Sequence, residues 1–381
     1  MKFSSLWRAT LGLLLAASVC PGLTLKDDGY HVFPGDNIQD ALQQAAGNKT
    51  NKVVKVHAGE YRPRAEGQAL IWFNQAHDGI RLEAVGAVTL TAANPELANP
   101  DVCGYPAMVN HVVYFGEGVT SNTVLRGFRI IGASHFVTGN LTEQMEPNTT
   151  IPKNLFFYSD GGGIKIFGHS YPTIQNVELV DNFASPCGAG ISIQQQGFKQ
   201  DPVLIENCVL RGNRAQVTGS AIDLLEGSAA RIVNCLLVSN VSNMGSDVVA
   251  KANGGITFTN SGVVTVFWNS RAEYRNCTFT GNRNAVDDMG GGSTYTDCIF
   301  ADDVLATGLS GTSRYELDLS AGAKVSGCLI RGVLLDPSHS VSETNNVLHA
   351  PPPLFDKNYV PAAAQYQQAG YRPPAITPPP K

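Results

Sequence analysis

The sequence is short of charge, and neither sign is concentrated in a stripe. Charged residues make up 15% of the 381 residues, with 27 Lys and Arg against 32 Asp and Glu, for a formal net charge of −5. A basic stripe that would neutralise phosphates is missing, so the composition argues against nucleic acid as a partner. The hydrophobic fraction of 43% is ample for a folded core.

Metal and redox motifs are missing, and so are long apolar runs. The eight cysteines include no Cys-x-x-Cys pair and the eight histidines form no cluster, which gives no support to zinc, haem or redox chemistry. No apolar run is long enough for a transmembrane helix. The run over 9–17 follows Lys2 and Arg8 and predicts a secretory signal peptide over residues 1–22. We therefore expect an exported protein, secreted, periplasmic or at the cell surface.

What the sequence does contain is one short pattern that recurs along its middle part. An apolar residue is followed by others three and five positions later, and Asn, Asp or Gly precedes the middle one. Neighbouring copies lie between 21 residues (Asn276 to Asp297) and 49 residues (Gly127 to Asn176) apart. A repeat of this kind is typical of a solenoid. The Asn, Asp or Gly positions, here called the corner column, are Gly127, Asn176, Asn207, Asn234, Asn276, Asp297 and Gly327.

The corner column has a backbone explanation. Asn, Asp and Gly enter the left-handed region at the lowest cost, so we expect a bend between two short strands at each copy. The two apolar residues after the bend are two apart and point to the same face of a strand. The pattern therefore predicts an all-β fold, a parallel β-helix over residues 23–350. A Pro-rich tail over 351–381 is expected to lie along the helix or free in solvent.

Five cysteines share the middle apolar position of the repeat. Stacked at roughly 4.8 Å per coil, their side chains would lie alongside one another rather than point toward one another, so we expect buried free thiols. Outside this stack, Cys103 and Cys187 are the plausible disulfide pair. The stacked cysteines are Cys208, Cys235, Cys277, Cys298 and Cys328.

The N-terminal part carries a resemblance to a known family. Residues 35–46 predict a short helix capped by Asp36 or Asn37. A strand over 53–61 follows and ends in an Ala-Gly-Glu-Tyr turn. A capping helix, a strand and this turn, opening a run of β coils, resemble the start of the pectate-lyase-like, right-handed parallel β-helix superfamily. The resemblance implies a right-handed coil covered at its N-terminal end by the helix. It also implies, for sugar-processing members, acidic and basic residues on an outward sheet face.

A second column of residues supplies candidates for such a face. In four segments a small or apolar residue precedes an apolar–X–apolar triplet, and the flanking apolar side chains point inward, so X points outward. We expect these four X residues to form an exposed ladder on one parallel sheet, with His169, Gln194 and Glu226 near its margin. The four are Lys165, Ser192, Asp223 and Thr257.

This predicted ladder suits the chemistry of uronic-acid polymers. Eliminative cleavage needs a base for the proton beside the carboxylate, and a cation or metal to neutralise that carboxylate. Lys165 is the candidate base or neutralising cation, and Asp223 is a candidate ligand for calcium, the one cofactor considered. Both are assigned as catalytic. An isolated Lys and an isolated Asp on an exposed sheet face are also ordinary solubility residues, and a fold of this kind hosts many functions. The remaining candidates are assigned to substrate binding: His169, Ser192, Gln194, Glu226 and Thr257.

Glycoside hydrolysis is the alternative chemistry, and it needs two or more carboxylates at a defined separation. Asp287-Asp288 is the candidate pair, and Gly168-His169-Ser170 is similar to the Gly-His-Gly motif of polygalacturonases. In that family the His motif follows the paired Asp, whereas here it precedes it, and the Asn-Thr-Asp and Arg-Ile-Lys motifs are missing. A polar bend is therefore the favoured interpretation of Asp287-Asp288. The segment 160–163 is interpreted as a turn entering a strand.

The sequence leaves two functions open. The first is binding or processing of an extracellular acidic polysaccharide, with lyase-type elimination as its enzymatic form. The second is a non-catalytic cell-surface or structural scaffold that binds partners through the insertions at 94–108 and 134–154. An outward groove of acidic and basic residues would favour the enzyme, and a smooth polar face would favour the scaffold.

Overall fold

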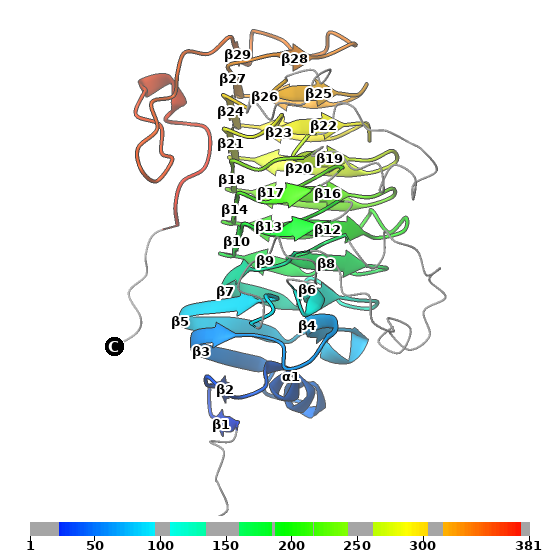
Figure 1. Cartoon of the computed structure of the whole chain (residues 1–381). Helices are drawn as coiled ribbons and strands as arrows, with labels where there is room; N and C mark the ends of the chain where they lie inside the picture. The colour runs from blue at the N-terminus through cyan, green and yellow to red at the C-terminus, as the bar shows by residue number, and fades with distance from the viewer. Residues whose placement is uncertain are drawn as a thin grey trace, which may run out of the picture.

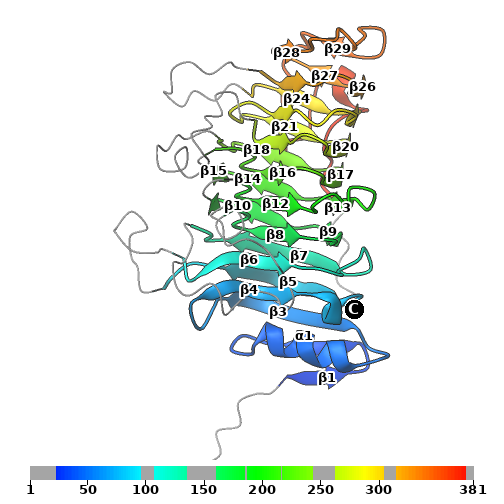
Figure 2. The same ribbon diagram turned by 90° about the vertical axis from the view of Figure 1, so that its right-hand side faces the viewer.

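The computed structural model describes residues 23–95, 107–134, 160–184, 187–215, 217–242, 262–303 and 315–374. The predicted signal peptide, Cys103, Thr257 and most of the two insertions lie outside these ranges. In the described part, no helix is long and apolar enough to cross a membrane. The coils stack along one axis, with the helix α1 at the N-terminal end (Figures 1 and 2).

Three stacks of short strands form the walls of the coil, and every pairing between named strands is parallel except β1 with β2. The first two stacks join through long N-terminal strands into one sheet, whose described part has 18 strands. The first stack comprises β1 (Thr24–Lys26), β2 (Gly29–Val32), β3 (Val53–Tyr61), β5 (Arg81–Thr91), β7 (Val124–Ile131), β9 (Thr173–Gln175), β13 (Val203–Glu206), β17 (Ala229–Val233), β20 (Arg271–Arg275), β23 (Thr294–Thr296) and β26 (Lys324–Ser326). The second comprises β10 (Glu178–Val180), β14 (Val209–Arg211), β18 (Leu236–Val238), β21 (Thr278–Thr280), β24 (Ile299–Ala301), β27 (Leu329–Ile330) and β29 (Val347–Leu348).

The third stack is a separate sheet, called the ladder sheet below. Its described part has nine strands, and β8, β12 and β16 lie at its centre in Figure 2. The short strands β11 (Phe183–Ala184) and β15 (Arg214–Ala215) pair in parallel in equivalent turns of successive coils. The strands of the ladder sheet are β4 (Gly67–Phe73), β6 (Val109–Phe115), β8 (Ile164–Phe167), β12 (Ile191–Gln194), β16 (Ile222–Leu224), β19 (Val264–Val266), β22 (Val286–Asp288), β25 (Leu317–Leu319) and β28 (Leu334–Leu335).

The corner column is confirmed. All seven residues have left-handed backbone angles, with φ between 50° and 86°. At Gly127 the strand β7 continues through the bend and pairs with both β9 and β10, whereas from Asn176 onward the bend divides each coil into two strands. The left-handed residue is therefore what separates the first stack from the second.

A substitution at Asn176 tests this explanation. Asn176→Val is expected to lower the free energy of unfolding by about 1–2 kcal/mol, because a β-branched residue is strained at φ 52°. Asn176→Gly is expected to be tolerated within about 0.5 kcal/mol, since glycine adopts this angle freely. Chemical denaturation of both variants measures the difference, and equal stabilities would contradict the explanation. Asn234 is less suitable for this test because its side chain also holds the C-terminal segment.

Inside the coil, buried asparagines form a hydrogen-bonded ladder. The backbone N and the Nδ2 of Asn182 both donate to Asn213 Oδ1, and the same two bonds recur from Asn213 to Asn240 and from Asn240 to Asn282, at 2.9–3.2 Å. The last member is not an amide: Asn282 donates from its backbone N and its Nδ2 to Asp303 Oδ1, at 2.9 and 2.6 Å. Because these asparagines hydrogen-bond to one another, the turn that contains them can be buried without leaving their amide groups unpaired.

The cysteine stack is also confirmed. All five stacked cysteines are buried free thiols in the core, and their sulfur atoms contact backbone carbonyl groups. Cys187 is likewise a buried free thiol. The stacking of identical positions extends to aromatic rings, since Tyr274 lies parallel to Tyr295 with ring centroids 4.7 Å apart. Equivalent residues in successive coils therefore pack on one another along the axis.

The helix α1 (Ile38–Gly47) closes the N-terminal end of the coil, as predicted. Asn37 caps it by accepting a hydrogen bond from the backbone N of Gln39. Its apolar face, including Ile38 and Leu42, is buried in the core. The strand β5 has an irregular register, because the residues between Glu83 and Val88 bulge without ending the pairing. Two short 3-10 helices, η1 (Gln75–His77) and η3 (Ala364–Tyr366), complete the described elements.

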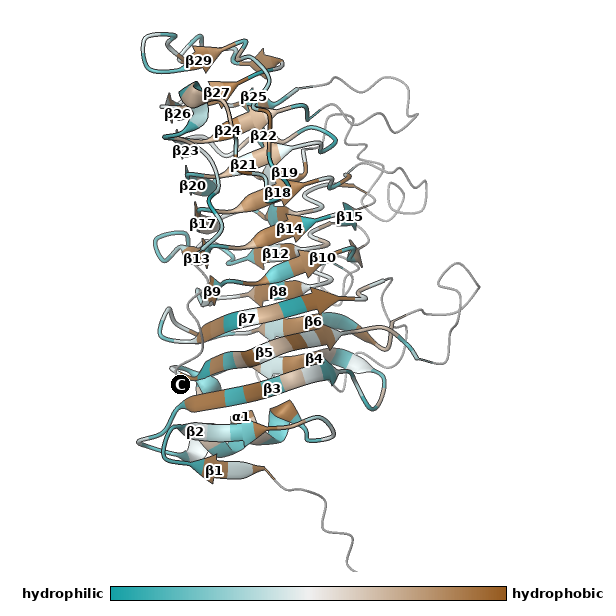
Figure 3. Ribbon diagram, turned by 90° about the vertical axis from the view of Figure 1, so that its left-hand side faces the viewer, coloured by the Kyte–Doolittle hydropathy of each residue, from teal (hydrophilic) through white to brown (hydrophobic). Residues whose placement is uncertain are grey.

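The described part of the Pro-rich tail, to residue 374, lies along the helix rather than away from it (Figure 1). This segment, called the strap, runs back over the outer face of the second stack, where Figure 3 shows β18, β21 and β24 to be largely hydrophobic. Tyr366 and Tyr371 are buried against that face. Arg372 and Asn234 exchange two hydrogen bonds of 2.7 Å. The strap therefore covers apolar surface that the short coils leave exposed.

Candidate functional site

The outward residues of the ladder sheet form one column in register, called the sheet ladder. Ile164, Ile191 and Ile222 point into the core, so their neighbours along each strand point outward. Thr265 occupies the position after Asp223, so the prediction of Thr257 for that position is wrong. Thr257 itself lies outside the described ranges. The members of the sheet ladder, in order along the axis, are Trp72, Tyr114, Lys165, Ser192, Asp223, Thr265, Asp287 and Asp318.

The expectation that these residues are exposed is wrong for the middle of the ladder. Lys165, Ser192 and Asp223 are fully buried. The physical reason lies in the bends that precede the strands, where Gly161, Gly188 and Gly219 have left-handed φ of 77°, 67° and 55° and lie against the outward side chains. The absence of a side chain at these glycines is needed. A Cβ at Gly188 would come within 2.6 Å of Ser192, and one at Gly219 within 2.5 Å of the Asp223 Cβ.

Lys165 forms a buried ion pair that the sequence analysis did not anticipate. Its Nζ donates to both carboxylate oxygens of Asp160 at 2.8 Å, to Ser192 Oγ at 3.2 Å and to Gln194 Oε1 at 2.9 Å. Ser192 Oγ in turn donates to Asp160 Oδ2 at 2.8 Å. Burial raises the pKa of Asp160, an effect that the Lys165 charge opposes. Asp160 was interpreted as a turn residue, and only its position five residues before Lys165 hinted at the contact.

Asp223 lies beside Ser192 on the next ladder strand, and its carboxyl group has a raised pKa. Burial, together with the negative charge of Asp160, raises the pKa of Asp223 to about 7. Oδ1 accepts a hydrogen bond from Thr218 Oγ1 at 3.1 Å, whereas Oδ2 has no partner among the described residues. A buried carboxyl group that exchanges its proton near neutral pH is a candidate acid or base.

Asp287 and Asp318 form a second acidic site on the same column. They occupy adjacent register positions in β22 and β25, so the interpretation of Asp287-Asp288 as a bend is wrong. Asp287 is 8% exposed, and burial together with the charges of Asp318 and Asp288 raises its pKa to about 7. Burial also raises the pKa of Asp318, which is the more exposed of the two. Asp288 points inward instead and accepts a hydrogen bond from Tyr295 at 3.1 Å.

The remaining predicted site residues lie at the carboxyl ends of the ladder strands. Gln194 is half-buried and accepts a hydrogen bond from Lys165 Nζ. His169 is half-buried, with Nε2 2.8 Å from Asp201 Oδ2 and its ring stacked on Phe198. Glu226 is exposed in the next turn but one. The structure therefore separates the predicted set into a buried network on the sheet face and an exposed group at its edge.

A metal site is not apparent in the part of the chain that the structure describes. No cluster of three or more His, Cys, Asp or Glu side chains there is arranged to hold an ion. The candidate calcium ligand Asp223 has Asp160 nearby as a carboxylate, but Asp160 is paired with Lys165. These residues do not fit a calcium ion, which takes six to eight oxygen ligands.

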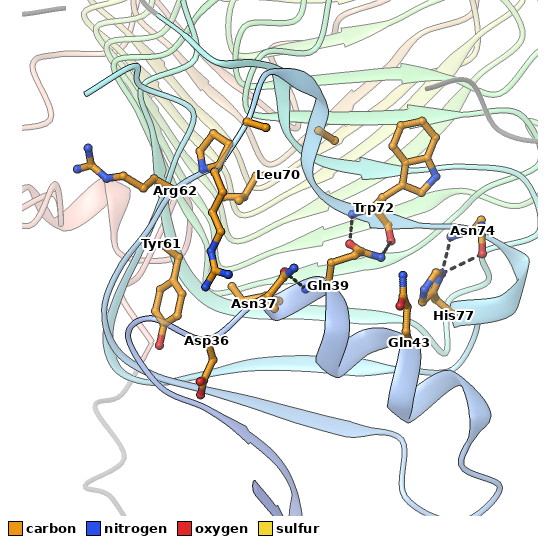
Figure 4. A pocket seen from close by; sticks show the side chains of 15 residues that line it. Asp36, Asn37, Gln39, Gln43, Tyr61, Arg62, Leu70, Trp72, Asn74 and His77 are labelled. Carbon is orange, nitrogen blue, oxygen red and sulfur yellow. Dashed lines mark hydrogen bonds between the residues drawn. The ribbon is translucent and has the colours of Figure 1, made fainter. Parts of the chain in front are cut away.

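A cavity of about 480 Å³ lies at the N-terminal end of the sheet ladder, where α1 meets β4 and Trp72 forms part of the lining (Figure 4). Gln39 links α1 to β4 through two hydrogen bonds. Its side chain donates to the Trp72 carbonyl at 2.9 Å and accepts from the Trp72 backbone N at 2.8 Å. These polar groups are already satisfied within the chain, so the cavity belongs to the attachment of the capping helix. Other lining side chains are similarly engaged by neighbouring groups: Asn37, Arg62, Arg64, Asn74 and His77.

Comparison with known families supports the architecture. Residues 119–298 match the family described as "Right handed beta helix region". No curated protein matches the sequence. The matched range begins just before β7 and ends after β23, and the parallel stacks continue without interruption on both sides of it. The fold is therefore a right-handed parallel β-helix, and residues 119–298 are the part that matches the family model.

Proposed function

We propose that this β-helix binds a polysaccharide at the C-terminal part of the ladder sheet, where Asp318 is partly exposed, and cleaves it by acid–base chemistry. The observation that carries the proposal is the Asp287–Asp318 pair, two carboxyl groups in adjacent register, one with a pKa raised to about 7. The resemblance to sugar-processing β-helix proteins supports a polysaccharide as the substrate. The predicted signal peptide fits an extracellular polymer.

Hydrolysis of a glycosidic bond uses one protonated carboxylic acid and one ionised carboxylate. Asp287 is the acid, because its raised pKa retains the proton near neutral pH. Asp318, the more exposed partner, is the carboxylate that attacks or stabilises the sugar. Adjacent parallel strands place the two Cα atoms roughly 4.8 Å apart, close to the carboxyl separation of about 5–5.5 Å in retaining glycosidases. Retention of anomeric configuration is the expected outcome.

Lyase-type elimination of an acidic polymer is the other enzymatic form. It requires a cation to neutralise the uronate group, and Lys165 was the candidate for that role. Its Nζ is buried and held by both oxygens of Asp160 at 2.8 Å, so its charge is already compensated. The geometry therefore favours hydrolysis over elimination.

A substrate panel tests the proposal. Purified protein is incubated with neutral and uronic-acid polysaccharides, while new reducing ends and the ultraviolet absorbance of unsaturated products are followed. We expect reducing ends without unsaturated product. Asp287→Asn and Asp318→Asn are each expected to lower kcat by about 100-fold or more without lowering the melting temperature. Activity should decline as pH rises through about 7, because Asp287 then loses its proton.

The matched control is Asp302→Asn, which changes an exposed aspartate paired with Arg331 and should leave activity unchanged. Unsaturated product would instead favour elimination. If no polymer is cleaved, the scaffold function takes its place. That second function has one observation of its own, since the Lys165–Asp160–Ser192 network is buried and satisfied as a structural network would be.

A further inference from the structure

We propose that the turns at the carboxyl ends of the ladder strands bind a neutral glycan chain that lies along the helix axis. The surface, called the aromatic edge, consists of four rings and two carboxylates from successive turns. The inference rests on the proposed function for the reaction and goes further by naming the substrate class. The residues of the aromatic edge are His169, Tyr171, Phe198, Trp268, Asp201 and Glu226.

Two of the rings are exposed and two are half-buried, and three of the four stack on one another. Phe198 is 37% exposed, and its ring lies nearly parallel to His169, with centroids 4.3 Å apart and an interplanar angle of 13°. His169 also stacks on Tyr171 at 5.4 Å. Trp268 is 57% exposed and is the most exposed aromatic residue of the described part. Single exposed apolar residues are common, but here four rings gather in successive turns, and flat rings suit ligands with flat apolar faces.

Polar contacts fix the rings in position. Lys199, next to Phe198, donates from Nζ to the backbone carbonyl of Asn269, next to Trp268, at 3.0 Å. The two turns are thereby joined across the intervening coil, where Gly197 donates to the Gly227 carbonyl at 3.1 Å. A surface held in place before binding loses less entropy on association.

The chemistry of the aromatic edge selects a neutral sugar. Pyranose rings present apolar C–H faces, which stack on aromatic rings, and hydroxyl groups, which donate to carboxylates. Asp201 and Glu226 supply those acceptors. Lys199 and Arg271 add two positive charges to the same turns, where Lys199 donates to the Asn269 carbonyl and Arg271 to the Lys199 carbonyl. The opposite charges balance, so the edge has no net charge to attract a polyanion, whereas a neutral sugar can both stack and hydrogen-bond.

The spacing fits a chain of sugars. Phe198 follows β12 and Trp268 follows β19, two register steps apart, so their turns are separated by roughly 10 Å. That separation is about the length of two linked pyranose units. The next two coils toward the C-terminus carry Asp287 and Asp318, so a chain that follows the axis from the aromatic edge reaches the coils of the acidic pair.

Binding measurements test this inference separately from catalysis. Affinity electrophoresis and calorimetry are performed with xylan, mannan and β-glucan as neutral glycans, and with polygalacturonate as the acidic one. We expect at least one neutral glycan to bind and polygalacturonate to bind weakly or not at all. Trp268→Ala and Phe198→Ala are each expected to weaken binding by about tenfold or more.

Phe33→Ala is the matched control, since Phe33 is 36% exposed and stacks on His57 at 4.3 Å at the N-terminal end; its loss should not change binding. Asp287→Asn should still bind the glycan, because Asp287 is not part of the aromatic edge. If the wild-type protein binds a neutral glycan but does not cleave it, the proposed function is contradicted and this inference is not. Preference for polygalacturonate, unchanged affinity in both ring variants, or no binding to any of the four polymers would overturn it.

Discussion

Lys165→Met is expected to lower the free energy of unfolding by about 3–5 kcal/mol. The substitution leaves Asp160 buried without its cation, and an uncompensated buried charge is costly. Ser192 and Gln194 also lose a hydrogen bond each. This differs from the expectation for an exposed catalytic lysine, whose loss would leave stability almost unchanged. Chemical denaturation of the purified variant measures the loss.

Two further variants make this test specific. Asp160→Asn combined with Lys165→Met removes both charges and should recover much of the lost stability, because the pair rather than either residue is what the interior tolerates. Arg129→Met breaks the exposed pair with Glu178 and should cost no more than about 1 kcal/mol. A loss for Lys165→Met as small as that for Arg129→Met would show that the pair is not buried in solution.

Asp303→Asn is expected to stabilise the protein by about 1–3 kcal/mol above neutral pH. Asp303 ends the asparagine ladder, and its carboxyl group lies beside Glu316, with one oxygen of each group lacking a partner among the described residues. Burial and the neighbouring Glu316 raise the pKa of Asp303 well above 3.8. An asparagine there keeps the acceptor for Asn282 and adds a donor for Glu316, so it relieves two buried acceptors at once.

The effect should depend on pH in a defined direction. Because the folded pKa of Asp303 is raised, the folded state holds a proton that the unfolded chain releases above about pH 4. The stability from this group is fully present below the unfolded pKa and is lost as pH rises through the folded pKa. The gain from Asp303→Asn should therefore be small in acid and grow toward alkaline pH. Melting temperatures measured across this range test it.

The neighbouring Asp302→Asn is the control for that series, because Asp302 is exposed and paired with Arg331 at the surface. Its stability curve should follow the wild type within about 1 kcal/mol at every pH. A gain for Asp303→Asn that is constant with pH would mean that the Asp303–Glu316 pair does not hold the extra proton.

Features that recur in every coil were predictable from the sequence. The corner column follows from the left-handed region that Asn, Asp and Gly reach most easily, and the cysteine stack follows from the alternation of side chains along a strand. The same alternation correctly placed Lys165, Ser192 and Asp223 in one register. Each of these inferences needs only a few consecutive residues, which is why sequence pattern was sufficient.

Features that depend on turns of irregular length, and on contacts between bends and the sheet face, were not predictable in this way. The turns that link the strands vary in length, so a sequence motif at Thr257 resembled the next ladder position that Thr265 occupies. Asp287 also belongs to the ladder, although the sequence around it resembled a bend. The variable turn length again hid its register. The glycines that cover the ladder each lie against the outward side chain four residues later, and Gly161 also lies against Ser192 of the next coil.

What the sequence by itself determined is therefore the solenoid: its corners, its inward stacks and its capping helix, because each depends on local backbone preference and on a period of two. What only the tertiary structure decided is the character of the outward face. Whether Lys165 is exposed or paired with Asp160, whether Asp287 faces Asp318, and where the strap lies are set by register between segments distant in sequence. Register is fixed by the hydrogen bonds and packing of neighbouring coils together, and no single coil contains that information.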